Sequence, residues 1–117
     1  MASAVIRMQD LTNIIADVSQ PLDRAVDVGA FGVVNLQTHR VKLPTVGPIV
    51  LHFDHSMTLE DSAFEPTGFF VTFTNGGATT PVTVTIPNPN RYLRWRSATT
   101  GGTYPIQFMI DMLGRER

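Results

Sequence analysis

Two stretches in the last third of the sequence alternate between apolar and polar or amphipathic side chains, and this pattern constrains the fold more than any other feature. Residues 91–96 contain the single tryptophan, Trp95, and in residues 106–112 every even-numbered residue is apolar. A repeat of two is typical of a half-buried β-strand. The Thr/Gly-rich residues 99–103 between them have turn chemistry. We therefore predict an antiparallel hairpin in which Trp95 faces Ile106.

Further segments upstream have the composition of short strands. The pair 69–74 and 81–86 predicts a second hairpin around a Gly-rich turn, and residues 33–43 alternate weakly, which is typical of a strand near a sheet edge. Residues 25–31 and 49–54 complete the set. We predict an all-β fold, an antiparallel β-sandwich of about seven strands, with a small closed β-barrel as the alternative.

The N-terminal segment does not share this pattern. Its apolar residues recur at spacings of three and four, as one face of a helix would, although Ile6 departs from the pattern. Pro21 makes a helix that continues through Gln20 unfavourable. We predict that residues 1–20 form either a short helix or an extended arm, and that residues 21–117 form the β-sandwich domain. The apolar stripe consists of Val5, Met8, Leu11, Ile14, Ile15 and Val18.

Composition restricts the class of protein. A chain of 117 residues with 43% apolar residues can form one domain with its own core. The absence of cysteine leaves no disulfide, thiolate metal site or cysteine nucleophile. Nine basic and ten acidic residues do not suit a protein that neutralises many phosphates, so nucleic acid is not an expected partner. No apolar run is long enough to span a membrane, and the first residues do not resemble a signal peptide.

Motifs for catalysis or cofactor binding are not evident. His52, Asp54 and His55 are the one cluster that resembles a metal-ligand set, but His52 and Asp54 share a strand face while His55 points away. No nucleophile elbow or phosphate-binding glycine loop is present. We expect a protein that is not an enzyme and that has no catalytic residue, cofactor or metal ion.

A surface for contact with other proteins is the better-supported hypothesis. Tyr92 and Arg94 belong to a basic and aromatic cluster on the outward side of a predicted strand, and Phe70 and Met109 also point outward. Together with the N-terminal stripe they suggest a homo-oligomer or a lattice-bound protein. The candidate interface residues are Val5, Met8, Leu11, Ile14, Ile15, Phe70, Tyr92, Arg94 and Met109.

Residues 90–96, 99–102 and 106–110, which read Asn-Arg-Tyr-Leu-Arg-Trp-Arg, Thr-Thr-Gly-Gly and Ile-Gln-Phe-Met-Ile, carry a family resemblance. The segment resembles the C-terminal hairpin of small β-sandwich virion proteins of tailed bacteriophages. The tryptophan-containing, Gly-rich middle segment common in such proteins is missing, and residues 44–67 match none of them.

The resemblance implies a structural protein of the virion. It would be a decoration or cement protein that reinforces the capsid, or a component of the head, neck or tail. Its partners would be coat or other virion proteins, and it would be assembled in the host cytoplasm. The alternative is a carbohydrate-binding module that uses Tyr92, and a small hydrolase is a third hypothesis.

Overall fold

The computed structural model describes residues 3–116, which form eight β-strands and two short 3-10 helices. The helices are η1 (Leu22–Arg24) and η2 (Asp61–Ala63). The strands are β1 (Ser3–Ile14), β2 (Val26–Asp27), β3 (Phe31–Lys42), β4 (Ile49–Ser56), β5 (Glu65–Phe73), β6 (Val82–Pro87), β7 (Tyr92–Thr99) and β8 (Ile106–Glu116). A membrane-spanning helix is not found within this described part of the chain.

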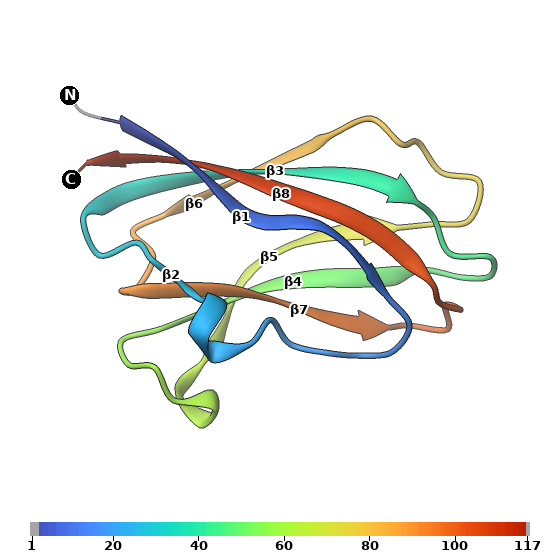
Figure 1. Cartoon of the computed structure of the whole chain (residues 1–117), viewed down its shortest axis with the longest axis horizontal. Coiled ribbons are helices and arrows are strands. Elements are labelled where there is room, and N and C mark those ends of the chain that lie inside the picture. The colour runs from blue at the N-terminus through green and yellow to red at the C-terminus, as the bar shows by residue number, and fades with distance from the viewer. Residues whose placement is uncertain (1–2, 117) are drawn as a thin grey trace.

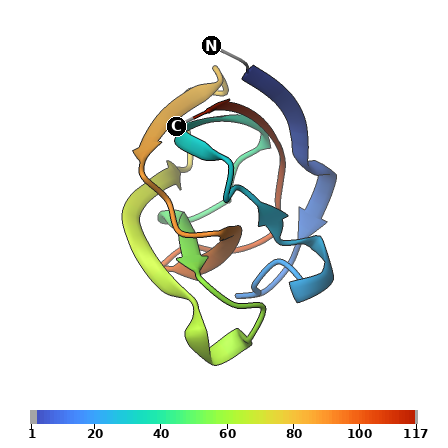
Figure 2. The same cartoon turned by 90° about the vertical axis from the view of Figure 1, so that its left-hand side faces the viewer.

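The strands form two four-stranded sheets with the orders β1-β8-β3-β6 and β2-β7-β4-β5, and all the pairings are antiparallel. Figures 1 and 2 show the sheets as two layers, with β1 along one side of the sandwich. Every connection except the one from β4 to β5 crosses from one sheet to the other, which is the jelly-roll arrangement. The prediction of an all-β antiparallel sandwich is confirmed, and the described residues form no closed barrel.

The alternating segments supply the core from both sheets. Trp95 on β7 and the even-numbered apolar residues of β8 are buried, as their period of two predicts. The indole of Trp95 meets the ring of Phe108 edge-on, with 5.1 Å between ring centroids. This contact joins the two sheets, because β7 and β8 lie in different layers. In β4, Ile49, Leu51 and Phe53 are fully buried, also as predicted.

Both predicted hairpins are wrong. β7 pairs with β2 and β4, so Trp95 lies opposite Phe53, while Ile106 lies opposite Ile14 on β1. Likewise β5 pairs with β4, and β6 pairs with β3. The physical reason is that a short Gly-rich loop can cross between sheets as readily as it can join neighbours. Alternation determines which side of a strand is buried but not which strand lies beside it.

The predicted strand at residues 33–43 is present as β3, which is not an edge strand itself but lies between β8 and the edge strand β6. Its polar side chains lie on the solvent-exposed face of the sheet. There Gln37 lies opposite Asp111 on β8 and Thr83 on β6. The weak alternation therefore indicates a strand with one solvent-exposed face, and it does not place the strand at the edge of the sheet.

The helix considered for the N-terminal segment is also wrong. Residues 3–14 form β1, which pairs with β8 and belongs to the sandwich rather than to a separate arm. Ile6, which departs from the helical spacing, lies opposite Met112 and packs against the core. Two irregularities between Arg7 and Thr12 shift the register, so the apolar spacing imitates a helix although the chain is extended.

Candidate protein interface

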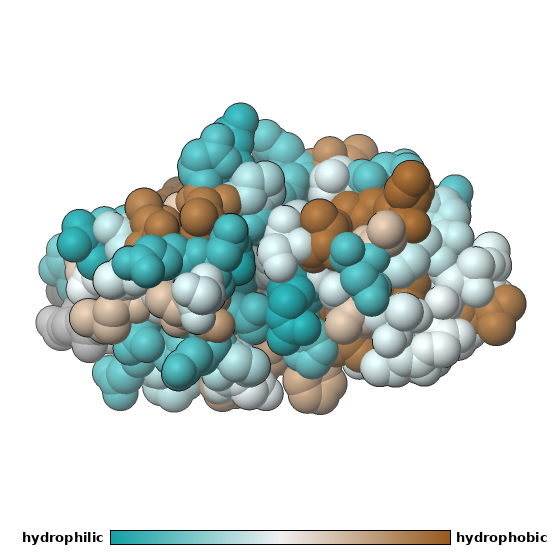
Figure 3. Space-filling view, turned by 90° about the horizontal axis from the view of Figure 1, so that it is seen from below, coloured by the Kyte–Doolittle hydropathy of each residue, from teal (hydrophilic) through white to brown (hydrophobic). Residues whose placement is uncertain are grey.

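Large apolar side chains are exposed along β1 and the segment that follows it. The exposed fraction is 77% for Val5, 59% for Leu11 and 74% for Ile15, and Val18 is exposed as well. Figure 3 shows that hydrophobic side chains gather in separate patches on the face it presents, with polar surface between them. We call these four residues the β1-side patch. Four such residues within 14 positions on one edge of a sandwich are typical of a surface that another protein covers.

A strip of charge accompanies this patch on the outer face of β1. The Arg7 guanidinium forms an ion pair with Asp111 on β8, and Nη1 of Arg7 lies 3.6 Å from Oδ1 of Asp10. His39 on β3 approaches the same Asp111 carboxylate, with Nε2 3.2 Å from Oδ2. The carboxylate of Asp10 is 89% exposed, so solvent screens its contact with Arg7 and this ion pair contributes little to stability.

The other strand edges are covered or shortened within the same chain. The backbone of residues 18–20 caps the free edge of β7, since Gln20 N–H donates to the carbonyl of Trp95 and Ser97 N–H donates to that of Val18. Arg40 caps β5 through a 3.1 Å hydrogen bond from Nη1 to the carbonyl of Thr72. β6 has only six residues and ends in a proline. Among the described strands, β1 is the longest edge strand, and side chains of the same chain reach it at the carbonyls of Met8 and Asp10, which accept from Nε2 of Gln20 and of Gln9.

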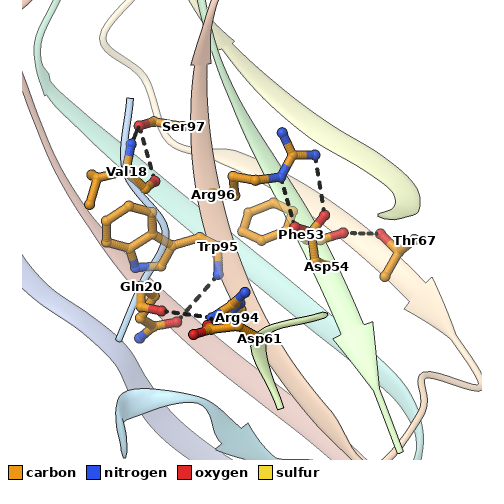
Figure 4. Close-up of polar contacts among 10 residues, drawn as sticks. All are labelled: Val18, Gln20, Phe53, Asp54, Asp61, Thr67, Arg94, Trp95, Arg96 and Ser97. Carbon is orange, nitrogen blue, oxygen red and sulfur yellow. Dashed lines mark hydrogen bonds and ion pairs between the residues drawn. The ribbon is translucent and has the colours of Figure 1, made fainter. Parts of the chain in front are cut away.

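A groove of about 660 Å³ runs between β1 and residues 18–26. Gln20 is buried beside it and connects its two walls. Its side-chain Nε2 donates to the carbonyl of Met8 at 2.9 Å, and its Oε1 accepts from the N–H of Trp95 at 3.3 Å. Trp95 Nε1 in turn donates to Oε1 of Gln9 at 3.0 Å. These bonds hold β1 in place over the opposite sheet, and Figure 4 shows Gln20 beneath the indole of Trp95.

The basic and aromatic cluster is an internal network rather than an open patch. Arg94 is buried because the segment around η2 folds over the outer face of its sheet. Its guanidinium lies 4.2 Å from the ring centroid of Phe64 and donates to Oδ1 of Asp61 at 2.7 Å. Arg96 donates to Asp54, which is also buried. Figure 4 shows both pairs on the side of β7 that faces away from the core.

The nine candidate interface residues are not brought together. Met8 and Ile14 belong to the core, and Arg94 is buried under η2, so none of these three offers an exposed contact. Phe70 is exposed on β5, and Tyr92 is half-buried on β7, in the sheet opposite to the one that holds Met109. The candidates that are both exposed and close in sequence are Val5, Leu11 and Ile15.

Tyr92 does not offer an open ring for stacking on a sugar. The guanidinium of Arg91 lies 5.1 Å from its ring centroid and covers one face. Arg91 also forms an ion pair with Asp27 at 3.4 Å, which holds it there.

His52, Asp54 and His55 each have a different environment. His52 lies against the ring of Phe70, with 6.0 Å between centroids, and burial followed by the nearby Arg96 charge lowers its pKa, which Asp54 partly opposes. Asp54 is paired with Arg96, and Nδ1 of His55 accepts from the N–H of Asn90. No group of three or more potential metal ligands converges among the described residues.

Sequence analysis missed the role of Gln20 and the capping role of Arg40. A glutamine before a proline is ordinary turn composition, and an arginine near a strand end is ordinary surface composition. These side chains become structural only because β1 pairs with β8 above Gln20 and because β3 packs against the sheet that holds Thr72, and neither arrangement is encoded locally.

Comparison with known proteins supports the fold. No protein-family model matches the chain, and no curated protein matches it in sequence. Among solved structures, the K1 cleaved adhesin domain of Lys-gingipain from Porphyromonas gingivalis W83 aligns with a TM-score of 0.58 and 11% identity over 100% of both chains. A disulfide-linked pilus protein of Bacillus endospore appendages aligns with a TM-score of 0.54 and 10% identity, over 100% of this chain and 93% of that one.

A protein of infectious bursal disease virus, Gx strain, aligns with a TM-score of 0.50 and 10% identity, over 96% of this chain and 31% of the viral chain. The likeness is one of fold. At such low identities the three structures show that the sandwich recurs in an adhesin, a pilus and a virus, and any function carried over from them is a proposal.

Proposed function

We propose that the protein is a non-enzymatic structural component of a bacteriophage virion, either a capsid decoration or cement protein or a component of the head, neck or tail. It binds coat or other virion proteins through the β1-side patch. In this role each copy adds contact area between neighbouring subunits and strengthens the particle.

The observation that carries the proposal is the β1-side patch itself. Val5, Leu11 and Ile15 expose most of their apolar surface although the domain has a complete core of its own. Burying such side chains against a partner is favourable by roughly 1.5–3 kcal/mol for each residue fully covered. A few anchors of this kind can dominate the free energy of a protein contact.

Two further facts support a structural role. Residues 90–110 resemble small phage virion proteins, and the fold is shared with proteins of a pilus and a virus. Arg94 and Arg96 pair with Asp61 and Asp54 of the same chain rather than converging on an open cavity. We accordingly propose no catalytic activity.

The test is co-sedimentation of the purified protein with particles assembled from the coat protein encoded beside it. The wild type is expected to pellet with the particles, and a double variant, Leu11→Ser with Ile15→Ser, is expected to remain in the supernatant. The matched control is Val46→Ser with Met57→Ser, because these two residues are equally exposed but lie in loops away from β1. Circular dichroism establishes that all the variants are folded.

Three results would contradict the proposal. The wild type could fail to bind the particles, the control could lose binding as completely as the β1 variant, or the β1 variant could bind normally. Specific binding to an oligosaccharide array that disappears in Tyr92→Ala would instead favour the carbohydrate-binding alternative.

A further inference from the structure

We propose that β1 pairs with β1 of a second copy of this chain, antiparallel and about a two-fold axis at Met8 and Gln9, so that the two β1-β8-β3-β6 sheets become one continuous sheet. This proposal rests on the proposed function of the β1 side as an assembly surface and names its partner.

The first argument comes from the strand edges. An unpaired edge presents a row of backbone N–H and C=O groups that another strand can satisfy. Residues 18–20 cover the edge of β7, whereas a side chain occupies a single carbonyl on β5, where Arg40 binds Thr72, and Gln20 occupies the Met8 carbonyl of β1. β1 is 12 residues long, and Figure 1 shows it at the border of its sheet, with β8 on one side only.

The second argument is the self-complementary charge of β1. In an antiparallel pair centred between Met8 and Gln9, Arg7 of each copy lies opposite Asp10 of the other. The exposed fraction is 45% for Arg7, whose guanidinium also pairs with Asp111 of its own chain, and 89% for Asp10. A two-fold axis makes this contact twice, as an isologous interface requires. Opposite charges directly across a strand pair are stabilising, and like charges are destabilising.

The register irregularities of β1 lie next to this axis. Arg7 lies opposite Asp111 and Thr12 lies opposite Phe108, so two extra residues are accommodated between them. In the proposed pair, Asp10 and Leu11 of this irregular stretch lie opposite Arg7 and Ile6 of the second copy. Bulges often protect an edge from promiscuous pairing, so this edge is not open to an arbitrary strand.

Apolar contacts accompany the ladder. Leu11 follows Asp10 directly, so it lies beside each of the two charge contacts, and Val5 lies further along the same seam. Both are among the most exposed apolar side chains of the described residues. Pairing would therefore cover part of the β1-side patch and leave Ile15 and Val18, beyond the end of β1, for contact with a different partner.

The experiment is sedimentation velocity and light scattering of the full chain over a range of concentrations up to about 100 µM. The wild type is expected to be a dimer whose dissociation constant rises with salt, because exposed charge contacts are screened. Asp10→Arg should weaken self-association by about tenfold to a hundredfold, since it turns both attractive contacts into repulsive ones. Glu60→Arg makes the same change of charge at an exposed residue just before η2, outside the groove beside β1, and should have no effect.

A mixing experiment makes the test specific. Asp10→Arg alone and Arg7→Glu alone should each be monomeric, whereas an equal mixture should form a heterodimer, because both cross-strand contacts are then attractive. If Arg7→Glu fails to fold next to Asp111, Leu11→Ser takes its place as a second variant that should weaken the dimer.

The proposal is overturned by a wild type that stays monomeric at the highest concentration, or by an Asp10→Arg variant that dimerises normally. A monomeric wild type that binds coat particles through Leu11 and Ile15 would refute self-pairing and leave the proposed function intact. A dimer that binds no particles would support self-pairing and refute the proposed function.

Discussion

Gln20 is the residue whose replacement tests the architecture most directly, because its buried carboxamide connects two strands from opposite sheets. Gln20→Ala leaves the carbonyl of Met8 and the N–H of Trp95 without the side-chain partners that lie at 2.9 and 3.3 Å. A buried polar group without a partner costs about 1–3 kcal/mol. We therefore expect the free energy of unfolding to fall by about 2–5 kcal/mol.

The assay is urea denaturation followed by tryptophan fluorescence, which reports on Trp95 itself. For a domain of this size the slope is about 1–3 kcal/mol per M, so the midpoint should fall by at least roughly 0.7 M. Gln37→Ala on the exposed face of β3 is the matched control and should leave the midpoint unchanged. A loss smaller than about 0.5 kcal/mol in Gln20→Ala would refute the reasoning, because it would mean that water replaces both bonds at no cost.

A second substitution at the same position separates hydrogen bonding from packing. Gln20→Glu keeps the size of the side chain, but its carboxyl group can donate to the Met8 carbonyl only while protonated. Burial should raise the pKa of that carboxyl group in the folded state above the ordinary value of about 4.3. A raised pKa gives stability that is present at low pH and lost as pH rises through the folded value. The free energy of unfolding of Gln20→Glu should thus be close to that of the wild type near pH 3–4 and should drop below it toward pH 7.

The remaining predictions concern the core, the first strand and one tyrosine. Trp95→Ala should cost about 3–5 kcal/mol, because the indole is buried against Phe108, and a denaturation midpoint equal to that of the wild type would contradict this. Deleting residues 1–14 should unfold the domain, since it removes β1 and exposes the edge of β8, and a cooperative melt at the wild-type temperature would show that β1 is dispensable. Burial and a hydrogen bond to Asp17 raise the pKa of Tyr104 to about 12, so absorbance titration of the folded protein should show a tyrosine that ionises well above the ordinary value of about 10. Because the pKa is raised, this contribution to stability is present below pH 10 and is lost between pH 10 and 12, and Tyr104→Phe should abolish that part of the alkaline loss.

Local sequence determined the strands and their buried sides but not their neighbours. The alternation through Trp95 and Phe108 correctly identified two inward-facing residues that touch. It suggested a contact within one sheet, whereas the rings meet across the core. The difference is physical: period-two alternation is a property of one strand, while pairing depends on where a loop directs the chain in space.

The candidate interface, too, could be predicted from the sequence only in part. Val5, Leu11 and Ile15 could be found from the sequence because exposed apolar residues carry a compositional signal. Met8 and Ile14 were placed with them because a helix and a bulged strand produce similar spacing. The burial of Arg94 could not be foreseen, since it depends on Phe64 and Asp61 folding back over a sheet whose strand order was not yet known.

The position of β8 has a consequence for how the chain is made. β8 is the last strand in chain order, yet it lies inside its sheet between β1 and β3, which otherwise have no common neighbour. During synthesis, β1 emerges from the ribosome first and must wait for about a hundred residues before its only partner appears. The nascent chain consequently exposes the apolar faces of β1 and β3 throughout translation and can close its core only after β8 has been released. Contacts between such distant residues are intrinsically slow to form, and apolar surface that stays exposed while they form favours aggregation.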